Sequence, residues 1–286
     1  MDDERLARRR AFFARRIAWQ AGADAAVEAA FAAVPREAFA GPPPWQIALH
    51  GPAGATYMEV PDDDPLHLCQ DVLVALDAAK GLNIGEPVLH ARCIAALALR
   101  PGEAVLHVGA GTGYYTAILA ELVGPRGRVD AYEVEPALAA RAAAALEGLP
   151  NVAPHARSGA VAPLPPADAV YVNAGLSQPC WPWLEALRPG GRLLFPLQSS
   201  GGFGGMLLVT KPVQGGLAWP ARFVQRASFV GCRVDLPGDT AVGLAAAFAG
   251  GGWQEVRCLR LDDDADASCW FAGRGWWLST GAAPSP

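Results

Sequence analysis

The chain has 286 residues, 52% of them hydrophobic and 18% charged, so it can bury a large core as one extended domain or one domain with appendages. Its net charge of −5 supplies no positive field for phosphates or anionic lipid, so we expect neither nucleic acid nor a membrane as a partner. No apolar run approaches the roughly 20 residues that span a bilayer, and the first ten residues are not followed by the apolar segment of a secretory signal. We therefore expect a cytoplasmic protein. The six cysteines lack metal-binding spacing, so we expect reduced thiols and no metal site.

The first 75 residues are predicted to form a helical and loop region. Residues 4–40 are rich in Ala and Arg and carry apolar residues at roughly helical spacing, which predicts one or two helices. From residue 41 to 65, prolines and an acidic run exclude long helices and predict loops.

Residues 76–212 are predicted to form the main domain. Short apolar strands alternate there with amphipathic helices, from VLHARCIAALAL near residue 88 to MLLVT near 210. This alternation is typical of a largely parallel sheet covered by helices on both faces. The sequence therefore predicts an α/β, doubly wound fold.

Residues 213–286 read differently from the main domain. They contain strand-like segments such as FVQRASFV and VRCLRL, and AGRG within SCWFAGRGWWLS has the composition of a hairpin turn. We expect a β-rich C-terminal extension that packs on the main domain.

The segment VLHVGAGTGYYTA, residues 105–117, combines a strand, three glycines and the start of a helix. Glycines let the backbone turn tightly and bring its N–H groups against a ligand at the carboxyl end of the strand. The spacing is GxGxG, not the GxGxxG of dinucleotide sites, and Tyr114 and Tyr115 would crowd a pyrophosphate. The loop therefore favours adenosyl-methionine over a dinucleotide.

Glu133 ends the next predicted strand, 20 residues after Gly113. At this distance an acidic residue can accept hydrogen bonds from both ribose hydroxyls. Both ligand classes contain a ribose, so Glu133 predicts a nucleoside without identifying it. The alternative is an exposed acid at a strand end.

Seven segments together resemble the protein-L-isoaspartyl O-methyltransferases, a family of class I adenosyl-methionine-dependent enzymes: VPREAF (34–39), NIGEP (83–87), residues 101–124, AYEVEP (131–136), NV (151–152), ADAVYVNAG (167–175) and LRPGGRLLFPL (187–197). The resemblance implies a Rossmann-like, mostly parallel, seven-stranded sheet. It also implies S-adenosyl-L-methionine as methyl donor and S-adenosyl-L-homocysteine as product. The cofactor-binding candidates are His107, Gly109, Ala110, Gly111, Gly113, Glu133, Val134, Ser158, Gly159 and Asn173.

The sequence departs from the family at four positions. His107 stands where the family usually has an acid that holds the donor's amino group, and Ser158 replaces the acid of a GDG-like segment. Gly85 replaces the serine that lies beside the reacting carboxylate, and Glu86 follows it. Because Glu86 would repel an anionic acceptor, we predict a changed acceptor, either a peptide carboxylate or a small molecule.

The catalytic candidates are Asn83 and Glu86, both in the NIGEP segment. Glu86 or His107 could take a proton from a hydroxyl or amine acceptor, while Glu86 could instead cap the helix that starts near Pro87. Asn173 either orients a ligand or forms a turn. If His107 contacts the donor, protonation near its ordinary pKa of about 6.5 should weaken donor binding. The alternative is an imidazole packed within the sheet.

Three hypotheses about function follow from these residues. A methyltransferase is favoured. An adenosyl-methionine-binding pseudoenzyme or adaptor comes second, because of His107, Gly85 and Ser158. A dinucleotide-dependent oxidoreductase comes third.

Overall fold

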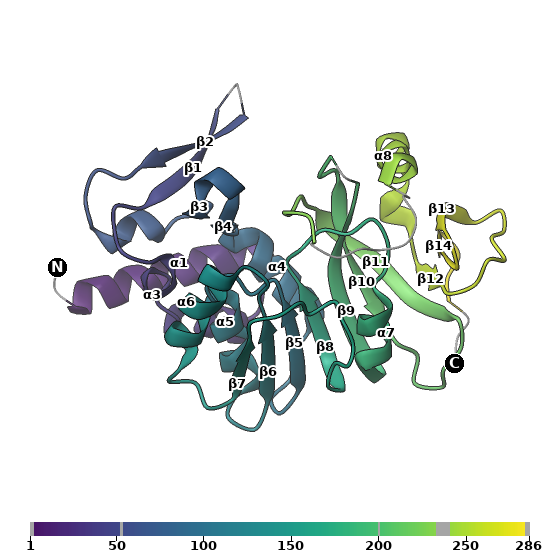
Figure 1. The fold of residues 1–286 in the computed structure, drawn as a ribbon, viewed down its shortest axis with the longest axis horizontal. Helices are drawn as coiled ribbons and strands as arrows, with labels where there is room; N and C mark the ends of the chain where they lie inside the picture. The colour runs from purple at the N-terminus through teal and green to yellow at the C-terminus, as the bar shows by residue number, and fades with distance from the viewer. Residues whose placement is uncertain (1–2, 52–53, 200, 233–240, 284–286) are drawn as a thin grey trace. The chain divides into compact units, whose positions relative to one another are not determined.

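The computed structural model describes residues 3–51, 54–199, 201–232 and 241–283, and the chain divides into two compact units (Figure 1). The first unit comprises Met1–Gly102 and Ala110–Arg157. The second unit comprises Glu103–Gly109 and Ser158–Pro286. The chain therefore passes from the second unit to the first within the glycine segment, between Gly109 and Ala110.

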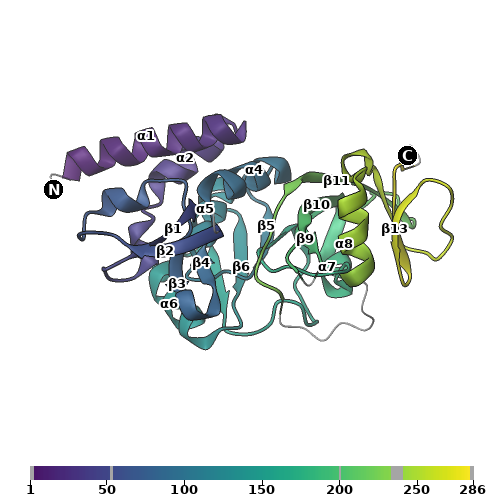
Figure 2. The same ribbon diagram turned by 90° about the horizontal axis from the view of Figure 1, so that it is seen from above.

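The first unit begins with helices, as the sequence predicts. Helix α1 (Asp3–Ala21) packs against α2 (Ala25–Ala33) and α4 (Pro87–Leu97), an arrangement visible in Figure 2. The Asp24 carboxylate caps α2 by accepting the Ala26 and Val27 N–H groups at 3.1 and 3.0 Å. A short helix, α3 (Glu37–Ala40), follows.

A four-stranded antiparallel sheet follows these helices, in the order β2-β1-β3-β4. Its strands are β1 (Gln46–Gly51), β2 (Gly54–Glu59), β3 (Val74–Asp77) and β4 (Leu82–Ile84), with 3-10 turns η1 (Pro65–Leu68) and η2 (Ala78–Lys80) between them. The prediction of loops was wrong for β1 and β2. The prolines of residues 41–65 lie outside the bounds of β1 and β2, so they leave the strands' own N–H groups free to pair.

The remainder of the first unit alternates helices and strands: α5 (Tyr114–Val123), β6 (Arg128–Tyr132), α6 (Pro136–Leu146) and β7 (Val152–His155). Strands β6 and β7 pair in parallel, with Val129 opposite Val152. Both α4 and α6 begin with proline. Proline suits the first helical turn because it has no backbone N–H, and a residue there has no carbonyl within the helix to donate to.

The second unit is built on one sheet, in the order β13-β14-β12-β11-β10-β9-β8-β5. Its strands are β5 (Ala104–Val108), β8 (Ala167–Val172), β9 (Leu187–Gln198), β10 (Gly204–Thr210), β11 (Ala218–Arg226), β12 (Cys258–Arg260), β13 (Cys269–Gly273) and β14 (Trp276–Ser279). The helical elements are α7 (Trp181–Ala186), α8 (Ala241–Gly250) and the turn η3 (Trp253–Glu255). Strand β8 pairs in parallel with β5 and β9, and the pairs from β9 onward are antiparallel.

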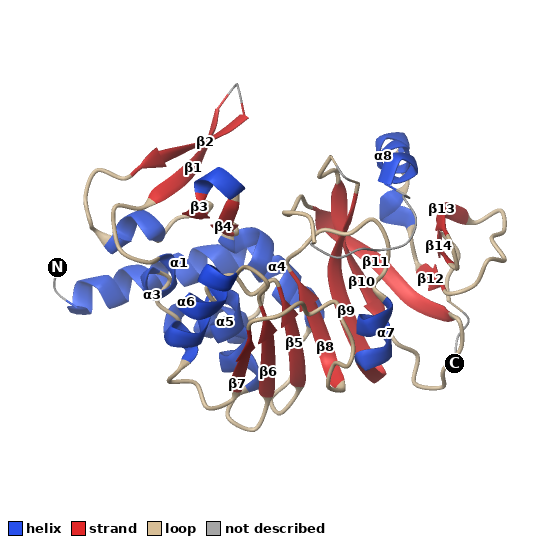
Figure 3. Ribbon diagram, in the orientation of Figure 1, coloured by secondary structure: helices blue, strands red, loops and turns tan. Residues whose placement is uncertain are grey.

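The predicted α/β alternation is confirmed. The prediction of a seven-stranded sheet is corrected, because further strands follow residue 226. The described part of residues 104–226 holds seven strands, β5 to β11, but β12, β14 and β13 continue the second unit's sheet (Figure 3). Strand β12 pairs with β11 and places Leu259 opposite Trp219. This pairing satisfies the backbone of β11, which would otherwise be an open sheet edge. Among the described residues, no helix combines the length and apolar character needed to cross a membrane.

Candidate functional site

The glycine segment turns sharply after β5. Gly109, Gly111 and Gly113 have φ values of +76°, +59° and +95°, a region that favours glycine. Close packing adds a second reason at two of them. A Cβ at Gly109 would lie 3.3 Å from the carbonyl carbon of Asn173, and one at Gly113 would lie 2.7 Å from Leu146 Cδ1. Larger residues at these positions would therefore distort the turn.

The structure brings Glu133 to this segment in the first unit. Its Oε2 accepts the N–H of Gly111 at 2.7 Å, and its Oε1 accepts the N–H groups of Val134 and Glu135 at 2.8 and 2.9 Å. A carboxylate offers about four acceptor positions and these N–H groups use three, so one position remains for a ligand hydroxyl. Glu133 is thus held by the backbone beside the middle glycine.

Residues next to these glycines and to Glu133 are either held by hydrogen bonds or able to contact a ligand. The Ala110 N–H donates to the carbonyl of Tyr132 at 3.0 Å, which ties the turn to β6. Thr112 is 2% exposed, and its hydroxyl has no hydrogen-bond partner among the described residues. Val134, beside Glu133, is 45% exposed, so its side chain is available to a ligand.

In the second unit, His107 and Asn173 form a hydrogen-bonded pair. The Asn173 N–H donates to the Val108 carbonyl at 2.8 Å, and its side-chain Nδ2 lies 2.8 Å from His107 Nε2. An amide nitrogen only donates, so Nε2 accepts and the imidazole is neutral. Asn173 Oδ1 is buried and has no partner within the described part of the chain.

His107 is fully buried, its ring nearly parallel to that of Tyr171 at 5.5 Å between centroids. Burial lowers the pKa of His107 from 6.5 to about 3, because charging the ring inside the sheet would cost its solvation. The folded protein therefore lacks the ordinary His107 pKa on which the pH-dependent donor contact was conditional. The structure instead has the alternative, an imidazole packed within the sheet.

Ser158 and Gly159 lie in a segment fixed by local contacts in the second unit. The Ser158 hydroxyl accepts the N–H of Ala160 at 3.2 Å. The Gly159 carbonyl accepts the indole N–H of Trp183 at 2.7 Å, and Trp183 is fully buried. Trp183 therefore supports this segment from the core.

The candidate catalytic residues lie in the first unit. Asn83 belongs to β4, and its Nδ2 donates to the Gly81 carbonyl at 3.0 Å. Glu86 is at the N-cap position of α4, but its side chain makes no capping hydrogen bond. The Val88 N–H donates instead to Asp71 Oδ1 at 2.8 Å. The alternative that the Glu86 side chain caps α4 is therefore wrong, because Asp71 supplies the acceptor at this helix end.

Gly85 is covered by His90, which the sequence did not single out. A Cβ at Gly85 would lie 2.1 Å from His90 Nε2, far inside van der Waals contact. His90 is 2% exposed, and its ring stacks on Tyr115 with 3.6 Å between centroids. The Tyr115 hydroxyl donates to the Gly85 carbonyl at 2.7 Å. Only glycine at position 85 leaves room for this packing.

Arg36 is a second residue that the sequence reading missed. It is 3% exposed, and its guanidinium donates to five backbone carbonyls, those of Leu68, Gln70, Val72, Ile84 and Gly85. No local pattern marks Arg36 as buried, since Glu37 follows it directly in VPREAF. Arg36 thus holds the end of β4 and the Gly85 turn through their carbonyls.

A family model described as "Protein-L-isoaspartate(D-aspartate) O-methyltransferase (PCMT)" matches residues 62–219, more than half of the chain. The chain belongs to this family. Its relatives include the protein-L-isoaspartate O-methyltransferase of Aeropyrum pernix, 39% identical over 127 residues, which cover 43% of this chain and 49% of that protein. The enzyme of that name from Anaeromyxobacter dehalogenans is 42% identical over 124 residues, 41% of this chain and 57% of the relative. The chain thus spans about half the length of these family members.

Solved structures of the family agree in fold. A protein-L-isoaspartate O-methyltransferase superposes with a TM-score of 0.62 and 21% identity, covering 82% of this chain and 69% of that one. A putative family member from Plasmodium falciparum, in complex with S-adenosyl-L-homocysteine, has a TM-score of 0.51 and 19% identity, covering 61% and 84%. These likenesses confirm the Rossmann-like α/β fold of class I methyltransferases.

Proposed function

We propose that this protein is an adenosyl-methionine-dependent O-methyltransferase whose acceptor, a peptide carboxylate or a small molecule, is not the isoaspartyl group. The observation that carries donor binding is Glu133, whose carboxylate the Gly111 N–H holds beside the glycine turn. Family membership favours this donor over a dinucleotide. We assign donor binding to the predicted domain of residues 76–212, which lies within the family match at residues 62–219.

The residues present fit this donor chemically. The remaining acceptor position of Glu133 suits a ribose hydroxyl. When bound, the donor supplies an electrophilic methyl group on its sulfonium.

Steric exclusion at Gly85 supports the changed acceptor. The family's serine is beside the reacting carboxylate, yet here a Cβ at this position would overlap His90 Nε2. Glu86 follows directly and would add repulsion toward a carboxylate. Both features oppose recognition of an isoaspartyl group.

Proton transfer, where the acceptor requires it, falls to the NIGEP segment. His107 is a poor base because burial lowers its pKa to about 3 and its Nε2 is occupied by Asn173. Glu86 is half-buried at the start of α4, and its side chain is not used as a cap. We propose Glu86 as the base and Asn83 as a residue that orients the acceptor.

Calorimetric titration tests donor binding. We expect S-adenosyl-L-homocysteine to bind and NAD not to bind. Glu133→Ala should weaken binding about tenfold or more, because a charge-assisted hydrogen bond is lost. Glu121→Ala, an exposed position on α5, is the matched control. A folded protein that binds NAD and not the homocysteine product would overturn the proposal.

Transfer of labelled methyl tests the acceptor. Wild-type protein should not label an isoaspartyl peptide under conditions in which a family enzyme labels it, and the matching normal aspartyl peptide is the control. Robust labelling of the isoaspartyl peptide alone would contradict the changed acceptor while leaving donor binding intact.

A further inference from the structure

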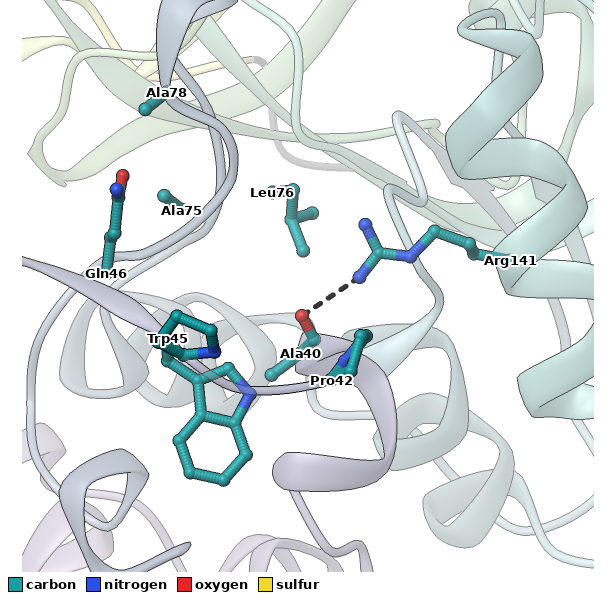
Figure 4. Close-up of a pocket in the computed structure, with 9 residues that line it drawn as sticks. Ala40, Pro42, Trp45, Gln46, Ala75, Leu76, Ala78 and Arg141 are labelled. Atoms are coloured by element: carbon teal, nitrogen blue, oxygen red, sulfur yellow. Dashed lines mark hydrogen bonds between the residues drawn. The ribbon is translucent and has the colours of Figure 1, made fainter. Parts of the chain in front are cut away.

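A cavity of about 360 Å³ lies within the first unit. It is lined by residues from the loop before β1, from β3 and η2, and from α6, among them Pro42, Trp45, Gln46, Leu76 and Arg141 (Figure 4). Volumes of this order are typical of small-molecule sites. Arg141 is the one charged residue among its nine lining residues.

The Arg141 guanidinium extends from α6 into this space (Figure 4). Its Nη2 donates to the Ala40 carbonyl at 2.9 Å and lies 3.5 Å from the Phe39 carbonyl. Desolvation lowers the pKa of the half-buried Arg141 from its ordinary value. Across the described residues, its polar contacts are carbonyls and none is a carboxylate. The cavity therefore contains a cation whose charge is not neutralised by a neighbouring acid.

Gly41 allows the guanidinium to take this position. A Cβ at Gly41 would lie 2.7 Å from Arg141 Nη2, and Gly41 has a φ of +85°. The backbone turn and the cation thus fit each other, and carbonyl contacts limit the motion of the arginine. A fixed guanidinium loses less conformational entropy when it binds a carboxylate.

Part of the cavity wall is apolar. Trp45 is 6% exposed, and its indole N–H donates to the Gly41 carbonyl at 2.9 Å. Trp45 therefore presents only ring surface to a ligand. Leu76 Cδ1 lies 3.7 Å from the position that a Cβ of Gly111 would take. The cavity therefore adjoins the middle glycine of the proposed donor loop, inside the first unit.

We propose that this cavity binds a carboxylate-bearing organic ligand, with the carboxylate on Arg141 and an apolar body against Trp45 and Leu76. Nη2 engages a carbonyl, while the other N–H groups can form charge-assisted bonds to carboxylate oxygens. The Gln46 amide adds a neutral donor on the wall. Identifying this ligand as part of the methyl acceptor rests on the proposed function; the carboxylate site itself does not.

Phenylacetate and its neutral counterpart phenylacetamide are suitable probes, with binding followed by calorimetry and ligand-observed NMR. We expect wild-type protein to bind the acid and to bind the amide about tenfold or more weakly. Arg141→Gln should reduce acid binding by a similar factor, and Arg141→Lys should retain part of it. Arg126→Gln, at an exposed arginine, is the matched control and should bind as wild type does. Gly41→Ala should also weaken binding, because it displaces the guanidinium without removing its charge.

Equal binding of acid and amide, or undiminished acid binding by folded Arg141→Gln, would overturn the inference. Titration of S-adenosyl-L-homocysteine on the same samples separates this failure from that of the proposed function. Homocysteine binding without phenylacetate binding contradicts the carboxylate site alone. Arg141-dependent phenylacetate binding without homocysteine binding supports the site and contradicts the methyltransferase.

Discussion

His107 is neutral in the folded protein, where its Nε2 accepts from Asn173, and burial lowers its pKa from 6.5 to about 3. In the unfolded chain the same ring takes up a proton below its ordinary pKa. Between these two values the unfolded state binds more protons, so stability falls as pH falls through that window. Donor affinity, in contrast, should show no His107-dependent change between about pH 5 and 7.5.

We predict that His107→Gln reduces the acid sensitivity of folding. An amide does not titrate, so the melting temperature of the variant should fall less than that of the wild type between about pH 7 and 4.5. Thermal denaturation followed by circular dichroism measures both profiles. Parallel profiles would contradict the buried neutral imidazole.

Gly85 and His90 should respond to substitution as a pair. Gly85→Ser should destabilise folding by about 1–3 kcal/mol, because its Cβ overlaps an imidazole stacked on Tyr115. His90→Ala opens that space, so the double variant should be more stable than the sum of the single effects by about 1 kcal/mol or more. Urea denaturation of the four proteins measures this coupling. The double variant should also gain labelling of an isoaspartyl peptide. Strictly additive stabilities would show that His90 does not exclude the serine.

Among secondary-structure elements, η1 and β4 depend on a buried cation from the segment before α3. Arg36→Met would remove one donor from each of five carbonyls, of which Gly85 keeps the Tyr115 hydroxyl, so we expect a loss of about 3 kcal/mol or more in the free energy of unfolding. Amide exchange should accelerate most from residue 68 to 85. Arg9→Met, on the exposed surface of α1, is the matched control. Unchanged exchange in that range would mean that other contacts hold these elements.

Elements with a strong local pattern could be predicted from the sequence. The helices of residues 4–40, the strand and turn at 105–113 and the acid after β6 all follow from the spacing of neighbouring residues. Strands β1 and β2 could not, because their pairing is decided by partners in space and the surrounding prolines dominated the composition. Asp71 was missed as the cap of α4 because it lies 17 residues before its partner.

Most side-chain contacts around the site could not be predicted either, because the residues that make them are far apart in the sequence. His90 fills the space over Gly85 only because α4 folds back on that turn, and Arg141 reaches Ala40 from about a hundred residues away. Motif spacing reports backbone requirements, such as the positive φ of Gly111, far better than it reports which side chain occupies a space. The backbone turn of the proposed donor loop was therefore easier to predict than the packing around Gly85.

At the scale of the whole molecule, the C-terminal strands stabilise the second unit as part of its sheet. Trp277 on β14 is 1% exposed, and its indole N–H donates to Asp262 Oδ1 at 2.8 Å. Trp277→Ala should lower the free energy of unfolding by about 3–5 kcal/mol. Trp181→Ala removes a side chain that is 47% exposed and should cost less than about 1 kcal/mol. Equal losses in chemical denaturation would mean that the extension is dispensable.

The overlap between Gly85 and His90 also limits the order in which this protein can change by mutation. A serine at position 85 meets His90 Nε2 at 2.1 Å from its Cβ, so a substitution at residue 85 is selected against while the imidazole is present. A smaller residue at position 90 must come first, although by itself it offers no new contact to an acceptor. Directed evolution that varies one position at a time should therefore keep glycine at 85. Libraries that vary residues 85 and 90 together should be the ones that recover isoaspartyl methylation.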